Sequence, residues 1–397
     1  MSLTAVVTAL TLALLPAPGT AARPILSPAE AAPFVPANHL GFAGTYADPV
    51  ADPWRPEPIR TPARPGFVVG PHGFTTVQDA VDAAYRAGGT ARRWIAVRPG
   101  TYTGTVFIPP GTPPLTIYGV GDARLEFTID ATVTPAQWAE QVNPDGRYAE
   151  GDPAWPMFQS CATRTSTTAG LCATVVWARS TDLQLKNLTI TNTLLDTVDR
   201  STHQALALRT DADRTQLEGL RLISRQDTLM TNADDADRIA RVSVRDTYVE
   251  GDTDFVFGRA AAVFSHCTFK LVSSRKPSGG VIFAPNTAPS YPYGFLVTHS
   301  RIVADDGYRT APTGRLGRAW DQGASATGYL PGITPNGQLV IRDSVIGPGF
   351  DTAAPWAPAA TTARPFTAST AEDRDLNDVG FNRLFEYANK GPAGSDR

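Results

Sequence analysis

The sequence predicts an all-β protein whose strands wind into a single-stranded parallel β-helix. Charged residues make up only 18% of the 397 residues, and 34 glycines and 34 prolines supply turns, so the composition favours strands over a helical bundle. Short apolar stretches recur at irregular intervals, which is typical of a solenoid. A β-sandwich would need hairpin signals between neighbouring strands, and the chain holds a single Asn-Gly pair, at 336.

The recurring stretches define the expected coils. Each alternates apolar and polar residues and has a polar or small pair in its middle. Their starts lie 32, 27, 21, 32 and 44 residues apart, and the shorter intervals suit three short strands and three turns per coil. The longer intervals are units with inserted loops, or two units. The stretches are LQLKNLTI at 183, TQLEGLRL at 215, VSVRDTYV at 242, VFSHCTFK at 263, FLVTHSRI at 295 and LVIRDSVI at 339.

Two segments precede the expected solenoid. Residues 1–22 hold an apolar run followed by Pro, Gly and small residues, which predicts a cleavable signal peptide and a secreted protein. No later stretch is long and apolar enough to span a bilayer. Residues 23–65 are rich in proline and are expected to form an extended lead-in.

Residues 66–397 are expected to form one domain with a helix at each end. Apolar residues between 77 and 84 recur at helical spacing before two glycines, which predicts a short helix that caps the first coil. Near the other end, residues 378–390 are predicted to form a helix that ends at Gly391 and packs along the solenoid.

The cysteines and the charge limit the possible partners. Cys161 and Cys172 flank the polar insert ATRTSTTAGL, which a disulfide could close in an oxidising compartment. Cys267 lies in a strand-like stretch and is expected to be a small buried residue. No Cys/His pair has zinc-type spacing, so no metal or other cofactor is expected. The net charge of −3 favours neither nucleic acid nor acidic membranes as a partner, and we expect a monomer.

The coil spacing predicts a polar ladder on one face of the solenoid. Gln204 and Gln226 are 22 residues apart, and Asp227 and Asp254 are 27 apart, so each pair is separated by about one coil. Residues one coil apart on a parallel sheet lie ~4.8 Å from each other. Arg318 follows Asp254 by 64 residues, or two to three coils, and could reach the same ladder.

Such a ladder suits hydrolysis. Two stacked carboxylates cannot both ionise cheaply, and an arginine beside one of them would keep that one ionised while the other keeps its proton. This gives a nucleophile or base next to a general acid, and nearby glutamine amides could donate to an oxyanion. The alternative is structural, with buried carboxylates bonded to turn amides and glutamines that satisfy each other along the solenoid.

Two other chemistries are rejected on sequence. His203 has no partner serine in a Gly-x-Ser-x-Gly elbow. The stretch DTDFVF lacks calcium ligands at its fifth position, Val256, and at its twelfth. Tyr248 and Phe257 are aromatic residues near strands and are expected to be core residues.

The stretches HQALALRT, RQDTL, GDTDFVFG and LGRAW resemble, in order, the four characteristic motifs of the pectinesterases. GFTTVQDAVDAA resembles the family's amino-terminal helix, and the resemblance runs from about residue 66 to residue 390. It implies a right-handed parallel β-helix that hydrolyses the methyl esters of polygalacturonate (pectin) to carboxylate and methanol without a metal.

The resemblance also implies a role for each motif residue. Asp254 would be the nucleophile, and Asp227 the general acid and then the general base. Gln226 and Gln204 would stabilise or position the oxyanion intermediate. Two further roles are implied: Arg318 would keep Asp254 ionised, and Trp320 would offer an aromatic face to a sugar ring.

Two positions depart from the family pattern, Gly104 and Ala319, and neither belongs to the expected chemistry. The region of the two paired cysteines and the carboxy-terminal part resemble a bacterial subgroup. Some members of that subgroup have been assigned acyl-thioester hydrolysis. That activity, a pectin lyase or glycosidase on the same scaffold, and a non-catalytic envelope protein therefore remain alternatives.

Overall fold

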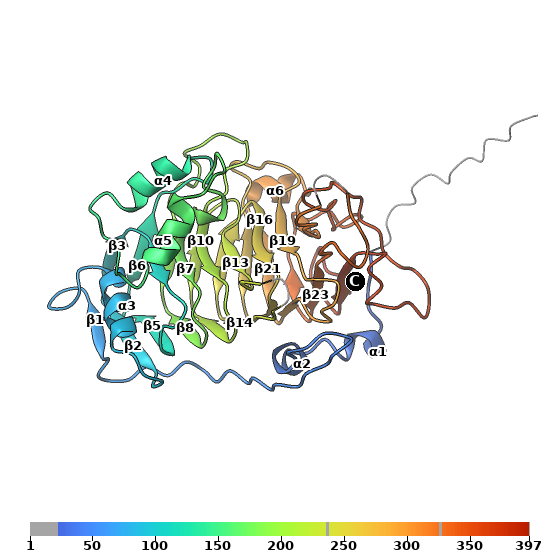
Figure 1. The fold of residues 1–397 in the computed structure, drawn as a ribbon. Helices are drawn as coiled ribbons and strands as arrows, with labels where there is room; N and C mark the ends of the chain where they lie inside the picture. Colours follow the sequence, from blue (N-terminus) through green and yellow to red (C-terminus); the bar gives the residue numbers. More distant parts are fainter. Residues whose placement is uncertain (1–22, 236–237, 325–327, 397) are drawn as a thin grey trace, which may run out of the picture.

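A computed structural model describes residues 23–235, 238–324 and 328–396. The predicted signal peptide, residues 1–22, lies outside the described residues. Within them the chain forms a right-handed parallel β-helix whose coils stack from β1 and β2, at the left of Figure 1, to the red segment at the right. Among the described residues, no helix is long and apolar enough to cross a membrane.

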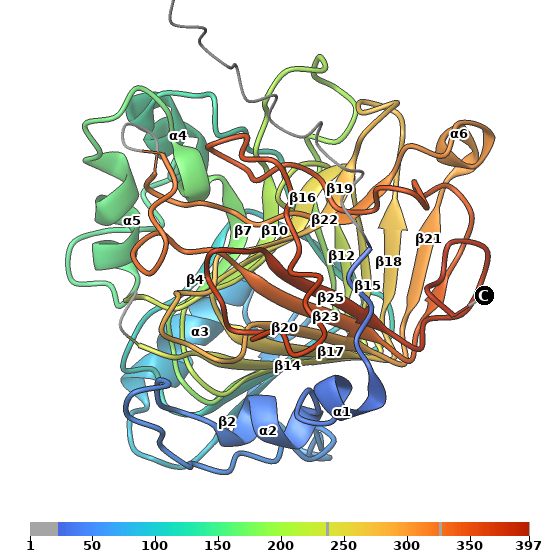
Figure 2. The same ribbon diagram turned by 90° about the vertical axis from the view of Figure 1, so that its right-hand side faces the viewer.

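Three parallel sheets form the walls of the solenoid, as the end-on view in Figure 2 shows. The first sheet contains β1 (Phe67–Val69), β2 (Arg93–Val97), β5 (Leu115–Gly119), β8 (Leu183–Lys186), β11 (Thr215–Glu218), β14 (Arg241–Arg245), β17 (Ala261–Ser265), β20 (Phe295–Thr298), β23 (Gln338–Arg342) and β25 (Arg383–Tyr387). The second contains β3 (Gly100–Thr103), β6 (Ala123–Phe127), β9 (Thr189–Asn192), β12 (Arg221–Ile223), β15 (Tyr248–Gly251), β18 (Thr268–Leu271), β21 (Arg301–Ala304) and β24 (Val345–Ile346). The third contains β4 (Val106–Ile108), β7 (Thr174–Ala178), β10 (Leu206–Thr210), β13 (Leu229–Thr231), β16 (Thr253–Gly258), β19 (Val281–Pro285) and β22 (Arg315–Gly317).

Each recurring stretch of the sequence is a strand of the first sheet, a tight turn and a strand of the second sheet, so the predicted coils are confirmed. The polar or small pair in each stretch makes the turn, because one of its residues takes a left-handed conformation that Asn, Asp, His and Gly adopt most readily. The residues, with φ between 49° and 64°, are Asn187, Gly219, Asp246, His266, His299 and Asp343.

Register between coils builds the core. In the first sheet, pairing places one apolar residue of each strand directly above that of the previous coil, and all six are buried. Each such side chain stabilises the fold by roughly 1.5–3 kcal/mol. The row consists of Leu185, Leu217, Val244, Phe264, Val297 and Ile341.

The predicted amino-terminal capping helix is confirmed as α3 (Val77–Arg86), whose apolar face is buried on the first coil. The predicted carboxy-terminal helix over 378–390 is wrong. The chain forms β25 there, the last strand of the first sheet, which pairs in register with β23. The apolar residues of this stretch fit both the helical and the strand period. The strand forms because pairing with the open edge of β23 satisfies backbone groups of β23 that a helix packed there would leave without hydrogen bonds.

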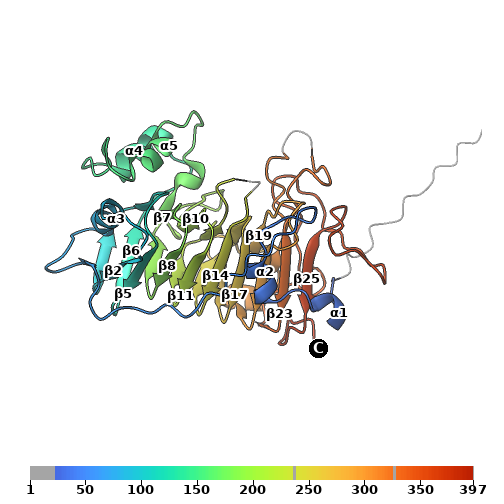
Figure 3. The same cartoon turned by 60° about the horizontal axis from the view of Figure 1, so that its bottom comes forward.

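The lead-in of residues 23–65 lies along the outer face of the first sheet, as the dark-blue chain in Figure 3 shows. It is not wholly extended, because it contains the short helices α1 (Pro28–Ala31) and α2 (Pro36–Gly41). Apolar residues of the lead-in pack against four strands of the first sheet, β17, β20, β23 and β25. Its Asp52 accepts hydrogen bonds from both Arg241 and Arg214.

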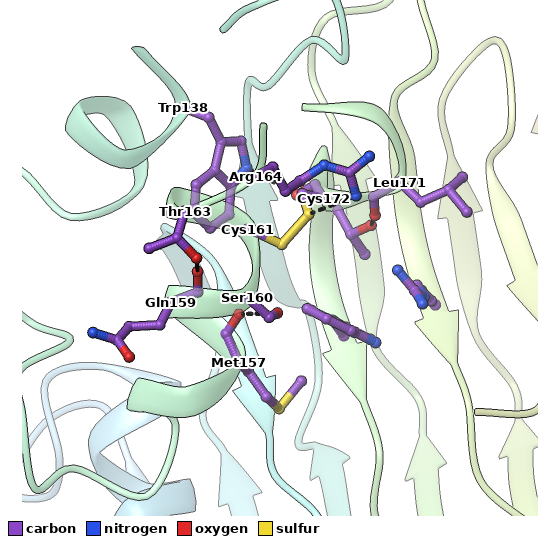
Figure 4. The surroundings of a disulfide bond; sticks show 12 residues. Trp138, Met157, Gln159, Ser160, Cys161, Thr163, Arg164, Leu171 and Cys172 are labelled. Carbon is purple, nitrogen blue, oxygen red and sulfur yellow. Dashed lines mark hydrogen bonds between the residues drawn. A yellow bond between two sulfur atoms is a disulfide. The ribbon is translucent and has the colours of Figure 1, made fainter. Parts of the chain in front are cut away.

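An insertion between β6 and β7 carries α4 (Pro135–Val142) and α5 (Trp155–Ala162) and stands outside the third sheet (Figure 1). Cys161, on α5, forms the expected disulfide with Cys172, at the end of a 3₁₀ turn (Figure 4). Cys267 is a buried free thiol, as expected. The remaining helix, α6 (Asp306–Thr310), follows β21.

Removing this disulfide is expected to destabilise the insertion. The bridge joins residues 11 positions apart, and closing a loop of that size contributes about 3 kcal/mol through the entropy of the unfolded chain. The double variant Cys161→Ser/Cys172→Ser should therefore lose about that much free energy of unfolding, measured by denaturant titration. A reductant should bring the wild type to the stability of the variant and leave the variant unchanged. Equal stability of oxidised wild type and variant would contradict the prediction.

Candidate active site

The third sheet brings the predicted ladder together. Gln204 and Gln226 form a parallel bridge just before β10 and β13, and Gln226 forms another with Thr253 at the start of β16. Asp227 and Asp254 follow these positions directly. Arg318 follows β22, two strands of the sheet beyond β16. The structure thus places four of the five predicted polar side chains at the starts of three adjacent strands, and Arg318 reaches Asp254 from the end of β22.

Asp254 and Arg318 form a bidentate ion pair. Nε of Arg318 donates to Oδ1 of Asp254 at 2.8 Å, and Nη2 donates to Oδ2 at 2.5 Å. Burial alone would favour the neutral form of Arg318, but the charge of Asp254 and these hydrogen bonds prevail and raise the pKa of the guanidinium. Two parallel charge-assisted bonds of this kind fix the position of the Asp254 carboxylate beside the guanidinium.

Asp227 has the opposite environment. Its side chain is buried, and burial together with the nearby charge of Asp254 raises the pKa of its carboxyl well above the ordinary value. Nε2 of Gln204 donates to Oδ2 of Asp227 at 2.7 Å, which leaves Oδ1 to carry a proton. The two carboxyl groups therefore have different environments, and both residues have left-handed backbones, with φ of 68° and 47°.

The carboxyl groups open into a pocket of about 480 Å³. Trp320 lies in its wall, with its ring 5.8 Å from that of Phe257. Phe257 is a buried core residue, as expected, and it also lines the pocket. The same expectation is wrong for Tyr248, which is only half-buried on the second sheet, where the guanidinium of Arg221 lies over its ring. The lining residues are Gln204, Gln226, Asp227, Asp254, Phe257, Ala284, Trp320, Ala360 and Thr361.

The carboxy-terminal segment supplies a wall of the pocket that the sequence does not predict. Ala360 and Thr361 come from a long excursion after β24, and Ala360 bridges to Trp320. Buried Asp321 fastens this excursion by accepting hydrogen bonds from Thr362 and Arg364. No motif marks these residues, because they reach the pocket through a loop whose path depends on the finished solenoid.

A second pocket, of about 600 Å³, adjoins the first and shares Gln226 with it. Its lining contains four basic side chains and one carboxyl group, that of Asp252, so the charge of the pocket is mainly positive. Three of these cations are not predicted from the sequence, because they lie on loops without a distinctive pattern. The basic residues are Arg200, Arg275, Lys276 and Arg318. Among the residues that the structure describes, no group of three or more His, Cys, Asp or Glu side chains could hold a metal ion.

Comparisons with known proteins agree with an enzyme of the parallel β-helix class. The family model described as Pectinesterase matches residues 158–330. Pectinesterase B of Dickeya dadantii (strain 3937) is 50% identical over 93% of this chain and 90% of its own length. The solved structure of rice weevil pectin methyl esterase covers 95% of this chain and 99% of its own, with a TM-score of 0.85 and 38% identity.

The Escherichia coli protein YbhC is also similar. It is 43% identical over 94% of this chain and 89% of its own length, and its name assigns it acyl-CoA thioester hydrolysis. Its crystal structure matches with a TM-score of 0.85. The chain belongs to the pectinesterase family, and it is an esterase.

Proposed function

We propose that the protein removes methyl esters from polygalacturonate (pectin) and releases methanol through a covalent aspartyl acyl-enzyme. The observation that carries this proposal is the unequal pair of carboxyl groups in the pocket: Asp254 forms a bidentate ion pair with Arg318, whereas burial and the charge of Asp254 raise the pKa of Asp227. Environments that separate the protonation states of two neighbouring carboxyl groups define the nucleophile and the acid.

In the first step, a carboxylate oxygen of Asp254 attacks the ester carbonyl carbon. The negative charge that develops on the carbonyl oxygen is stabilised by amide N–H donors of Gln226 and Gln204. Asp227 gives its proton to the departing methoxy oxygen, so methanol leaves as a neutral molecule. The products of this step are methanol, an anhydride between Asp254 and the uronate, and an ionised Asp227.

In the second step, Asp227 accepts a proton from water while the water oxygen attacks the uronate carbonyl of the anhydride. The bond to Asp254 breaks, and its carboxylate pairs with Arg318 again. The sum is one ester and one water converted to one carboxylic acid and one methanol. Asp227 ends protonated, as it began, because the transfer from water reverses its earlier donation.

The surroundings of the pair suit a polymer of acidic sugars. Trp320 and Phe257 offer aromatic faces in the catalytic pocket, and the basic pocket beside it suits the carboxylates of a polyanion. The disulfide suits an oxidising compartment, which supports a secreted protein acting outside the cell. We expect the chain to act as a monomer.

The test is methanol release from highly methylated pectin by the purified protein. The second candidate, acyl-thioester hydrolysis, follows from the similarity to YbhC. It is assayed in parallel as thiol release from acyl-CoA. Methanol release without chain shortening or unsaturated products supports the proposal and excludes a lyase or a glycosidase. Thiol release without methanol would replace it by the second candidate.

The activity is expected to fall as the pH rises. Asp227 must start protonated to act as the acid, and its raised pKa moves its deprotonation above the ordinary range near ~3.9. At a pH below its raised pKa, Asp227 is protonated and can act as the acid. At a pH above that pKa, kcat/KM should decline tenfold per pH unit. The measurement is the pH profile of kcat/KM for methanol release. A profile that stays flat from acid through neutral pH would contradict the assigned roles.

A further inference from the structure

His203 precedes Gln204 directly, but it is not among the residues that line the catalytic pocket. Its imidazole lies between two carboxylates. Nδ1 is 2.6 Å from Oδ2 of Asp130, and Nε2 is 3.0 Å from Oδ1 of Asp199 and 3.0 Å from Oγ of Ser201. The side chain is only 14% exposed, so the ring is fixed at both nitrogens.

The backbone of His203 contacts the oxyanion machinery. Its N–H donates to Oε1 of Gln226 at 3.0 Å. A carboxamide has one acceptor end and one donor end, and an N–H can pair only with the oxygen. This single bond therefore fixes which way the Gln226 amide points and leaves its Nε2 as the donor toward the pocket.

Asp130 holds this backbone from the neighbouring coil. Its Oδ1 accepts from the N–H of Thr132, so the carboxylate is oriented by its own turn. The next residue, Ala131, donates its N–H to the carbonyl of Gln204 at 3.0 Å. The turn at 130–132 thus forms hydrogen bonds to the side chain of His203 and to the carbonyl oxygen of Gln204. These two groups lie on either side of the peptide bond that joins His203 to Gln204.

We propose that the Asp130–His203 pair is a positioning device that orients the Gln226 carboxamide toward the oxyanion. This inference rests on the proposed function, and it assigns a purpose to a motif residue that the proton transfers do not use. The oxyanion is absent from the bound ester and develops only in the tetrahedral intermediate and the transition states beside it, so a misplaced amide lowers kcat and leaves KM nearly unchanged.

The kinetic test is a double-mutant cycle between His203→Ala and Gln226→Ala, read as methanol release. One oxyanion donor contributes about 10²–10³ in kcat, so partial misplacement by His203→Ala should cost about 10–100-fold. The same change in the Gln226→Ala background should cost less than about twofold, because the amide it positions is already gone. His203→Asn, whose amide N–H can still donate to Asp130, should recover most of the loss.

Equal losses in both backgrounds, or a rise in KM alone, would overturn the proposal in favour of a structural role. If His203→Ala does not fold, Asp130→Ala enters the cycle in its place, since it removes the same contact from the other side. Its expected outcomes are the same.

A crystal structure of the His203→Ala or Asp130→Ala protein decides the question without activity. We expect the Gln226 amide to turn or to lose the bond to the backbone N–H of residue 203. An unmoved Gln226 would overturn the proposal. A wild type that releases no methanol would refute the proposed function, and this structural comparison would still decide whether the pair positions Gln226.

Discussion

The Asp254→Ala protein is expected to release methanol at least about 10⁴-fold more slowly than the wild type, because no carboxylate remains to attack the ester. Loss of the nucleophile removes the covalent route, and only binding and the oxyanion donors persist. The measurement is kcat for methanol release from highly methylated pectin, with circular dichroism to verify the fold.

Asp254→Asn is the matched variant, because the amide keeps the shape of the carboxylate beside Arg318 while removing its nucleophilicity. It should be as inactive as Asp254→Ala. Asp211→Asn controls for the loss of a buried carboxylate, since Asp211 pairs with Arg209 outside both pockets and should retain methanol release. Activity of Asp254→Asn within tenfold of the wild type would remove Asp254 from the reaction.

Asp227→Asn is expected to reduce methanol release about 10²–10⁴-fold, the usual contribution of a general acid and base. The asparagine cannot protonate the departing methoxide or activate water. Its effect should depend on the leaving group, because an activated aryl ester needs no proton on its alcohol. With such an ester the first step should recover while the second stays slow.

That difference is observable as a covalent adduct. With an activated aryl ester of galacturonate, Asp227→Asn should show a burst of released phenol and accumulate an acyl group on Asp254. Intact-protein and peptide mass spectrometry would locate it. A variant equally slow toward methyl and aryl esters, with no adduct, would contradict the assigned acid and base roles.

Much of the fold was predictable because the coil imposes a local pattern. Each recurring stretch encodes two strands and the left-handed turn between them, so turn residues such as Asn187 and Asp246 can be recognised from the sequence alone. The carboxy-terminal strand was not predictable in the same way. The stretch around Leu384 and Phe385 fits a helix or a strand, and the open edge of β23 that decides between them exists only in the folded solenoid.

The candidate site likewise has one part that the sequence predicts and another part that it does not. Gln204 and Gln226 bridge to each other because their separation matches one coil, which the sequence displays. Thr361 lines the same pocket only after a long excursion, and Asp130 reaches His203 across 73 positions from the other side of an insertion. Sequence spacing carries no distance information for such loops, so neither contact could be predicted.

The lead-in along the first sheet has a consequence for the order of folding. Arg23 forms a partly buried ion pair with Glu386 of β25, 363 residues later in the chain. The lead-in therefore finds its binding surface complete only when β25, the last strand of the described residues, has formed. Contacts between residues so distant in sequence form late in folding, so we expect the lead-in to pack onto a solenoid that has already formed. Until the lead-in packs there, the apolar outer face around Val263 and Leu296 is exposed to solvent. Exposed apolar surface of this kind makes a folding intermediate prone to aggregate.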